Sequence, residues 1–255
     1  MSALLTRGEK AQAKEHQKLL LDIAGRLIEE KRKEIPPPSD RVFEAERQEV
    51  LASLEIFLRM EEGLSANVTP RFFEMQFGIG SARKDAPGGT DPVKIEFGKG
   101  SFFLRGRIDR VDEIGKHEYR VVDYKTGGAF GFRSNAYFEE GKNLQHCLYA
   151  RAAEAILREK SDKSARVVEG AYYFPTRKGR AQFLHRPQNR AADVNSLLNT
   201  LFDIIKNGAF APSRKECFLC SDYALCESTR ASLKEKRDNV RNTVLEPIRK
   251  LEEYE

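Results

Sequence analysis

Residue types and segments that mark secreted and membrane proteins are scarce in this chain. Only four cysteines occur among 255 residues, and none of them lies in residues 1–146. No apolar run approaches the ~20 residues that a membrane-spanning helix needs. The first residues also lack the apolar core and small-residue cleavage site of a secretory leader. These absences argue against a membrane helix and a disulfide-bonded scaffold, so we expect a cytoplasmic protein with no membrane partner.

A nucleotide-binding loop of the form Gly-X-X-X-X-Gly-Lys-Ser/Thr is also absent, so we do not expect the chain to hydrolyse ATP itself. The composition is ordinary for a globular protein, with 40% hydrophobic and 33% charged residues. The length suffices for one sizeable core with helical elaborations. The net charge of +5 is compatible with a polyanionic partner. Whether such a partner binds depends on how the positive charges are distributed over the surface.

Two neighbouring β-rich runs carry the charged residues that matter most for function. Residues 101–112 and 119–126 are rich in aromatic and β-branched residues and are separated by a short turn, which predicts two adjacent strands. Side chains alternate between the faces of a strand, so Asp123 and Lys125 share one face. If the polar faces of the two strands coincide, Asp109 converges with them.

Two carboxylates side by side repel each other unless a cation lies between them. Hard oxygen ligands of this kind suit Mg²⁺ or Mn²⁺. A metal held there could polarise a phosphodiester, while the lysine orients a water molecule or balances developing charge. The pattern therefore favours phosphodiester hydrolysis. The alternative is that Asp109 and Asp123 are solubilising charges of an edge strand, paired with Arg107 and Lys125.

The two runs also match a longer pattern. Gly-X-Ile-Asp-Arg-Val-Asp begins at Gly106, and Asp-Tyr-Lys-Thr-Gly begins at Asp123. Together they resemble the core of the PD-(D/E)XK nucleases, specifically the RecB/AddB-type exonuclease branch. The resemblance implies that Asp109 and Asp123 bind the metal ion, Mg²⁺ or Mn²⁺, and that Lys125 completes the catalytic site.

The resemblance extends to the order of the expected elements. Residues 70–80 predict a first strand, residues 143–159 a helix, and residues 167–176 a further core strand. This is the α-β-β-β-α-β order of a restriction-endonuclease-like core, an α/β fold with a mixed sheet flanked by helices and helical additions at both ends. Gln145 and Tyr149 stand one helical turn apart and look like the Gln-X-X-X-Tyr motif of the family. The match implies that both border the catalytic site and support substrate and metal.

Four consecutive parts follow from these patterns. They are an N-terminal helical segment (residues 1–66), the nuclease core (67–210), a cysteine metal-binding knot (211–228) and a charged C-terminal helix (229–255). Within the first part, Glu61 is expected on a solvated helix face.

Further charged and aromatic residues lie near the motifs in sequence. Glu74 belongs to a Glu-X-X-Phe-Gly segment that resembles one in AddB-type domains, and it is either an accessory acid of the site or an exposed strand glutamate. Phe130 and Phe132, in the loop after the lysine, either stack on bases or simply pin the loop. The candidate DNA-contacting cations are Arg107, Arg133, Arg177 and Lys178.

Three cysteines lie close together at Cys217, Cys220 and Cys226. Their spacing indicates a metal knot, and either zinc or a [4Fe-4S] cluster would need a fourth ligand. In the resembled family, similar cysteines join one upstream cysteine to hold an iron–sulfur cluster, which is the candidate here. Cys147 falls on the buried stripe of its helix, where a small apolar role is expected. The fourth ligand is not identified: it lies outside this chain, another residue replaces it, the site is vestigial, or these are ordinary reduced thiols.

The residues and the resemblance together imply a metal-dependent deoxyribonuclease, and we expect an exonuclease that acts on DNA ends or single strands in repair or recombination. A helicase domain or subunit would have to supply any unwinding. One alternative is a non-catalytic DNA-binding subunit that keeps the nuclease fold, and another is a scaffold whose metal knot holds a partner. Both acids and the lysine argue against a pure binder, which has no need of carboxylates beside phosphates.

Overall fold

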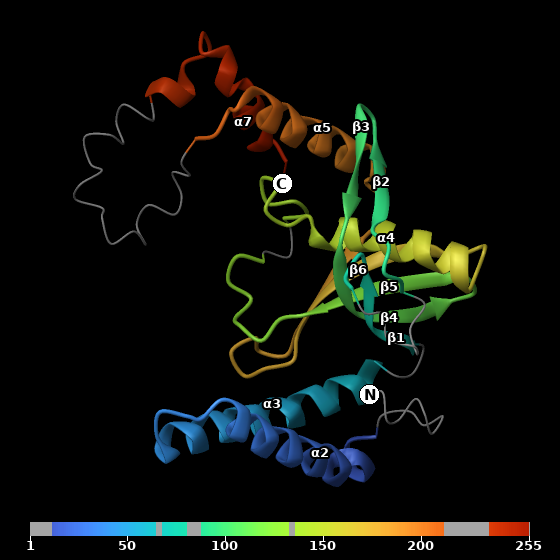
Figure 1. Ribbon diagram of the computed structural model, residues 1–255, viewed down its shortest axis with the longest axis vertical. Helices are drawn as coiled ribbons and strands as arrows, with labels where there is room; N and C mark the ends of the chain where they lie inside the picture. The colour runs from blue at the N-terminus through green and yellow to red at the C-terminus, as the bar shows by residue number, and fades with distance from the viewer. Residues whose placement is uncertain (1–11, 65–67, 81–87, 133–135, 212–234, 255) are drawn as a thin grey trace. The chain divides into compact units, whose positions relative to one another are not determined.

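The computed structural model describes residues 12–64, 68–80, 88–132, 136–211 and 235–254 (Figure 1). The chain divides into two compact units. The first comprises Met1–Ile95, Phe102–Ser134 and Gln145–Asn189, and the second comprises Glu96–Ser101, Asn135–Leu144 and Arg190–Glu255. Within the described ranges, no helix has the length and apolar character needed to cross a membrane.

A five-stranded mixed sheet forms the core of the first unit (Figure 1). In spatial order its strands are β1 (Thr69–Phe77), β4 (Gly106–Gly115), β5 (Glu118–Tyr124), β6 (Arg166–Phe174) and β7 (Gln182–Pro187). Neighbouring strands are antiparallel except β5 and β6, which are parallel. Helix α4 (Gln145–Lys160) makes the crossover that such a parallel pair requires.

Two helices, α2 (Ala13–Glu34) and α3 (Asp40–Leu64), precede the sheet. The succession α3, β1, β4, β5, α4, β6 has the α-β-β-β-α-β order expected of a restriction-endonuclease-like core, with one hairpin inserted after β1. The predicted fold class is therefore confirmed. Strand β7 has no counterpart among the predicted strands.

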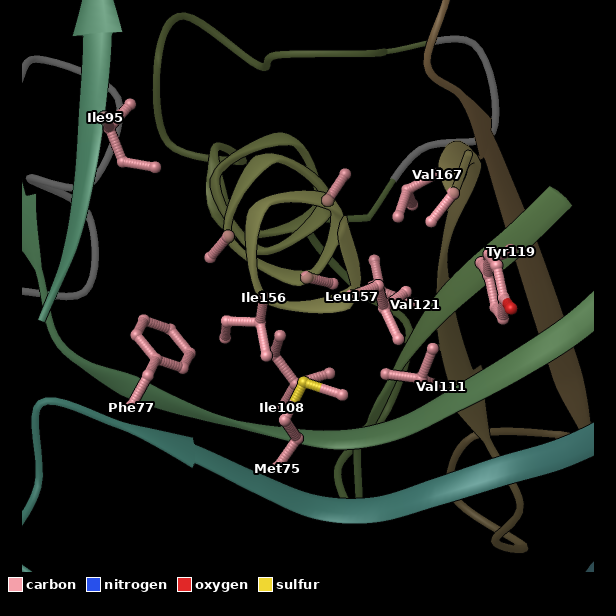
Figure 2. Packing of buried hydrophobic residues seen from close by; sticks show 14 residues of the cluster. Met75, Phe77, Ile95, Ile108, Val111, Tyr119, Val121, Ile156, Leu157 and Val167 are labelled. Atoms are coloured by element: carbon pink, nitrogen blue, oxygen red, sulfur yellow. The ribbon is translucent and has the colours of Figure 1, made fainter. Parts of the chain in front are cut away.

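Helix α4 packs on one face of the sheet through small and branched apolar residues (Figure 2). Ala152, Ala153 and Leu157 are fully buried there, and the short alanine side chains let the helix lie close to the strands. The strands contribute large side chains to this cluster, among them Met75, Phe77, Ile108, Val111 and Val121. Burying each large apolar side chain stabilises the fold by about 1.5–3 kcal/mol, so α4 and the sheet hold each other in place.

The prediction of one strand over residues 101–112 is wrong, because the chain breaks at Arg105 into two strands of different sheets. The separate two-stranded sheet consists of β2 (Val93–Phe97) and β3 (Gly100–Leu104). Strand β4 then begins at Gly106, where a Cβ atom would lie 3.1 Å from the Phe77 ring. A larger residue there would have a tight contact with this ring, which would have to shift by a few tenths of an ångström.

The second unit is built around helix α5 (Ala191–Asn207). The ring of Phe202 on this helix packs against Phe97, with 4.6 Å between centroids. The Asn199 side chain accepts the backbone N–H of Lys99 at 3.0 Å. The helix ends at Gly208, whose φ of 60° is a left-handed conformation that favours glycine.

The charged C-terminal helix predicted over residues 229–255 is described only from residue 235 to residue 254, where the chain forms short helical segments. One helical turn at residues 235–238 is followed by non-helical residues, and then by the 3₁₀ helix η3 (Thr243–Leu245) and helix α7 (Glu246–Leu251). Pro247 lies in the first turn of α7, where its missing N–H would have no helical partner anyway. Farther inside a longer helix the same proline would break the hydrogen-bond ladder.

A buried ion network lies on the sheet face opposite α4. Arg110 of β4 is 1% exposed, and its guanidinium lies 2.6 Å from Glu61 of α3 and 2.5 Å from Asp112. The second oxygen of Asp112 lies 2.8 Å from Arg120 of β5. Glu61 is only 2% exposed, so the expectation of a solvated glutamate is wrong. Its helical position did not show that a cation on a distant strand would reach it.

Replacing Arg110 by alanine should destabilise the protein by about 3–5 kcal/mol, because Glu61 would stay buried without a cation and Asp112 would keep only Arg120. Urea denaturation followed by circular dichroism measures the loss. As a matched control, Arg166→Ala removes a pair whose side chains are 62% and 41% exposed and should cost no more than about 1 kcal/mol. Equal losses in the two variants would show that the buried network adds nothing beyond a surface pair.

Candidate active site

The acids and the lysine of the two motifs meet where the start of β4 lies beside the end of β5. Asp123 is the residue before the last of β5, and it follows Val121 and Val122, which are buried on opposite faces of the sheet. Strand alternation places Asp123 on the face of Val121, towards α4. Lys125 comes just after the strand, and its backbone N–H donates to the carbonyl oxygen of Tyr173 on β6 at 2.8 Å. Two neighbouring strands thus fix the Asp-X-Lys segment.

Gln145, the first residue of α4, links the acid and the lysine. Its Nε2 atom donates to Asp123 Oδ1 at 2.5 Å, and its Oε1 atom accepts from Lys125 Nζ at 2.9 Å. The Lys125 ammonium also lies 2.6 Å from Asp123 Oδ2. The three side chains therefore form a closed set of polar contacts, with each of them held by the other two.

Asp109 joins this set through the backbone between the acid and the lysine. Its Oδ2 atom accepts the backbone N–H of Tyr124 at 2.9 Å. The regular pairing of β4 with β5 runs from Glu113 to Arg110 on β4 and stops there. Beyond this point the Tyr124 N–H of β5 donates its hydrogen bond to the Asp109 carboxylate instead of to a backbone carbonyl oxygen. This bond keeps the first acid beside the strand that carries the second.

Burial decides the electrostatics of Asp123, which is 8% exposed. Loss of water raises the pKa of its carboxyl group, the neighbouring Lys125 opposes this rise, and the negative charge of Asp109 adds to it. Asp123 Oδ2 is buried and receives no hydrogen bond of normal geometry from the described residues, although the ammonium is close. The Lys125 ammonium, 2.6 Å away, therefore balances the charge of this buried oxygen, and a metal ion bound there would share the oxygen with it.

The family model described as PD-(D/E)XK nuclease superfamily matches residues 3–227. The chain belongs to this superfamily. The match covers the whole first unit's sheet together with α5, so the contacts among Asp109, Asp123, Lys125 and Gln145 lie within the superfamily region.

Two more specific relatives share part of the chain. Each is named as a subunit of an ATP-dependent helicase/deoxyribonuclease. The protein from Desulforudis audaxviator is 38% identical over 110 residues, which is 41% of this chain and 8% of that protein. The protein from Symbiobacterium thermophilum is 34% identical over 124 residues, which is 45% of this chain and 10% of that protein. The chain thus corresponds to a small part of each relative, and these similarities support a nuclease-type function.

PD-(D/E)XK nucleases generally use divalent metal ions, and the donor set here suits such an ion. Asp109 and Asp123 supply hard carboxylate oxygens, and the buried Oδ2 of Asp123 lacks a hydrogen bond. Among the described residues, no group of three or more His, Cys, Asp or Glu side chains is arranged to hold a metal. Mg²⁺ does not need such a group, because it usually keeps several waters and binds through one or two carboxylates plus substrate phosphates.

Tyr149 lies one turn after Gln145 on α4, but it faces the packing between helix and sheet. Its ring meets Phe77 edge to face, with 6.2 Å between centroids, and it also fills the space in front of Gly106. The contacts place Tyr149 in support of the strand that carries Asp109. A direct role at the substrate stays a prediction.

Glu74 and Arg107 form an ion pair beside the site, with 2.9 Å between Arg107 Nε and a carboxylate oxygen of Glu74. The strand register pairs the residues on either side of Glu74 with those on either side of Asp109, so the two acids are neighbours across β1 and β4. Glu74 has a φ of 54°, which is uncommon and strained for a residue with a side chain. Whether it acts as an accessory acid stays a prediction.

The structure describes two of the other candidate DNA-contacting cations. Arg177 and Lys178 are exposed in the turn between β6 and β7, and Arg177 approaches Glu49 of α3 at 3.8 Å. Arg133 lies outside the described residues. Their contacts with nucleic acid stay a prediction.

The cysteines divide into two groups. Cys217, Cys220 and Cys226 lie outside the described residues, so the metal knot stays a prediction. Cys147 on α4 is 1% exposed, and burial raises the pKa of its thiol to about 11. It is therefore protonated at neutral pH, which favours the expected small apolar role over that of a metal ligand.

The sequence did not predict that aromatic rings would lie beside the Lys125 ammonium. Tyr172 lies opposite Asp123 in the register of β5 and β6, and the Lys125 ammonium is 5.6 Å from its ring centroid and 5.9 Å from that of Phe132. Phe132 itself packs edge to face on Tyr172 and Phe174, so this ring pins the loop. The signal available was the aromatic run on the predicted strand over residues 167–176.

The pKa of Asp123 should respond in opposite directions to its two charged neighbours. Lys125→Met should raise it further, and Asp109→Asn should lower it, because one variant removes a stabilising cation and the other a repelling anion. Carboxyl ¹³C NMR titration measures the value, and Lys116→Met, an exposed cation of the β4–β5 turn, is the control that should leave it unchanged. A wild-type pKa at or below the ordinary value would contradict the arrangement.

The same shift has a consequence for stability. The folded-state pKa of Asp123 lies above its unfolded value, so its contribution to stability is complete below the unfolded pKa and is lost as the pH rises through the folded pKa. At neutral pH the ionised carboxyl is therefore a cost that a bound cation can offset.

Proposed function

We propose that this chain is a metal-dependent DNA nuclease that hydrolyses phosphodiester bonds. The observation that carries the proposal is the closed contact set of Asp123, Lys125 and Gln145, with Asp109 attached through the Tyr124 backbone. A buried acid, a fixed ammonium and a second acid on adjacent strands have no evident use in packing alone. They match the chemical needs of phosphodiester cleavage.

Asp109 and Asp123 are the residues that would hold Mg²⁺ or Mn²⁺. The ion supplies a positive charge that polarises the scissile phosphate and lowers the pKa of a bound water. Asp123 Oδ2 is the proposed ligand atom, since Oδ1 accepts the hydrogen bond from Gln145 whereas Oδ2 lies in an ion-pair contact with Lys125. Asp109 contributes from β4, and its bond to the Tyr124 N–H sets its orientation.

Lys125 would orient the attacking water and balance the negative charge that develops on the phosphate. Its ammonium is held by Gln145 and flanked by aromatic rings, so its position is set before substrate arrives. Gln145 is then a positioning residue, because it acts through Asp123 and Lys125. Tyr149 supports the same region by packing against the start of β4.

DNA ends or single strands are the proposed substrate, with exonucleolytic cleavage in repair or recombination. Arg107, Arg133, Arg177 and Lys178 would contact the phosphate backbone. The names of the relatives suggest a helicase domain or subunit as partner, and this chain has no ATP-binding loop of its own. The cysteine trio would add a structural [4Fe-4S] cluster with a fourth ligand from elsewhere. We also propose the four-part division with boundaries near residues 66, 210 and 228.

Cleavage is tested with end-labelled linear single-stranded and duplex DNA in Mg²⁺ or Mn²⁺, using protein purified without loss of any bound cluster. Asp123→Asn should reduce cleavage to background. Lys125→Met should lower the rate by about 10²- to 10³-fold, because the charge that develops on the phosphate loses its fixed partner. The product ladder gives the polarity.

Two exposed residues provide matched controls for this assay. Asp22→Asn on α2 and Lys116→Met on the β4–β5 turn change the same side-chain types outside the site and should cleave like wild type. If wild type binds DNA but never cuts it, and both site variants bind equally well, the chain is a non-catalytic DNA-binding subunit and the nuclease proposal is wrong.

Metal binding gives a second readout that does not depend on cleavage. Calorimetric titration with Mn²⁺ measures the affinity for the ion. Loss of a residue that only supports a metal ligand weakens metal binding by about 10- to 100-fold. Asp109→Asn and Asp123→Asn should each weaken it by more than this, because they remove a ligand. Lys125→Met should retain the ion, since the ammonium competes with it for Asp123. Unchanged Mn²⁺ affinity in both aspartate variants would rule out these two residues as the metal ligands.

A further inference from the structure

One aromatic side chain near the site is left in solvent. Phe130 lies in the loop after β5 and Lys125, and its side chain is 94% exposed. In the same loop the Phe132 ring is packed on Tyr172 and Phe174. The loop therefore directs the Phe132 ring inward and the Phe130 ring outward.

The exposure of Phe130 follows from a defined turn. The backbone N–H of Phe132 donates to the carbonyl oxygen of Ala129 at 3.0 Å, and Gly131 between them has a φ of 91°. This is the geometry of a type II turn, which needs a residue such as glycine at its third position and displays the side chain of its second position, here Phe130. The aromatic ring is thus presented at the tip of a turn.

A basic turn lies against this loop. Thr176 Oγ1 donates to the Thr126 carbonyl oxygen at 3.3 Å and accepts the Gly179 N–H at 2.9 Å. A Cβ atom at Gly128 would be 3.5 Å from the Lys178 carbonyl oxygen, so the two loops touch. They continue the parallel strands β5 and β6, and therefore leave the sheet at the end where Asp123 and Lys125 lie.

The basic turn is itself held in one shape. A Cβ atom at Gly179 would lie 2.5 Å from Phe174 Cβ, so only glycine fits there. Around this buried glycine the turn exposes Arg177, Lys178 and Arg180. Two contacting loops thus display one aromatic ring and three cations at the catalytic end of the sheet.

An aromatic ring with nearby cations is the chemistry that binds single-stranded nucleic acid. Each unpaired base offers a π-face that stacks on an aromatic side chain, while Arg and Lys contact the backbone phosphates. In a duplex both faces of an internal base are already covered by its neighbours. A ring displayed in this way can therefore distinguish a single strand from a duplex.

We propose that Phe130 stacks on a nucleobase of single-stranded DNA whose phosphates contact the cations of the basic turn. The inference rests on the proposed nuclease function and specifies its substrate as a single strand or a single-stranded end. The stacked base would fix the register of the strand over Asp123 and Lys125. Phe132 has no such role, because its ring is used for packing.

The test is the affinity of the full chain for a labelled single-stranded oligonucleotide, measured by fluorescence anisotropy without divalent metal so that no cleavage occurs. Phe130→Ala should weaken binding by about 5- to 100-fold, the range that loss of one base–aromatic stack gives. Phe130→Leu should be weakened too and Phe130→Trp should not, because the interaction needs a π-face. Affinity for a blunt duplex should stay unchanged.

The matched control is Phe103→Ala on β3, which removes another exposed phenylalanine, 68% exposed, and should bind the single strand like wild type. On an oligonucleotide of abasic sites, wild type and Phe130→Ala should bind equally. Arg177→Ala and Lys178→Ala should weaken binding to all sequences and flatten its salt dependence.

Three results would overturn the inference: equal affinity of wild type and Phe130→Ala, equal weakening by Phe103→Ala, or no single-strand binding by wild type at all. A loss of protein–protein association with unchanged DNA affinity in Phe130→Ala would instead assign the ring to a protein partner. Cleavage by wild type is recorded separately. If the chain binds single strands through Phe130 but never cuts DNA, the base-stacking site is retained and the nuclease function is wrong. If wild type cuts DNA and Phe130→Ala binds single strands normally, the nuclease function is retained and the base-stacking site is wrong.

Discussion

The contacts of one tyrosine hold the site together from both faces of the sheet. Tyr124 stands between Asp123 and Lys125, and its backbone N–H is accepted by Asp109. Its hydroxyl group accepts a hydrogen bond from the buried guanidinium of Arg110 at 3.2 Å. Strand alternation makes this arrangement necessary, because a residue between two site residues must point to the opposite face. The charged site on one face therefore depends on the ion network on the other.

That network is an unusual foundation for a site, because buried ion pairs gain little over apolar packing. The cost of removing charges from water can exceed their mutual attraction. The network orients the side chains of three elements relative to one another. Arg110 connects α3, β4 and β5 through hydrogen bonds to Glu61, Asp112 and Tyr124. Charged hydrogen bonds fix angles as well as distances. An apolar core would hold the strands together without fixing their side chains so closely.

The parallel pair β5 and β6 explains why the groups proposed to bind substrate lie at the same end of the sheet as the acids. Chains that leave parallel strands emerge at the same end of a sheet, so the loops after Lys125 and after Phe174 begin next to each other. Thr176 joins them, because its hydroxyl group donates a hydrogen bond to the Thr126 carbonyl oxygen. The same two strands therefore position both the candidate catalytic residues and the groups proposed to bind substrate.

Local patterns in the sequence determined the class of the fold and the candidate site. The paired motifs at Asp109 and Asp123, together with the helix of Gln145 and the burial of Cys147, are readable because strand alternation, helical periodicity and residue type act within a few residues. The same local signals missed β7, and they wrongly joined residues 101–112 into one strand.

Only the tertiary structure decided which distant groups meet. It showed that Gln145 bridges Asp123 and Lys125, that Glu61 is buried against Arg110, and that Phe132 is packed while Phe130 is exposed. Residue type alone does not decide these outcomes, since a glutamate or a phenylalanine occurs in both buried and exposed positions. Each depends on burial and on partners brought close by sheet pairing and helix packing, which periodicity along the chain cannot specify.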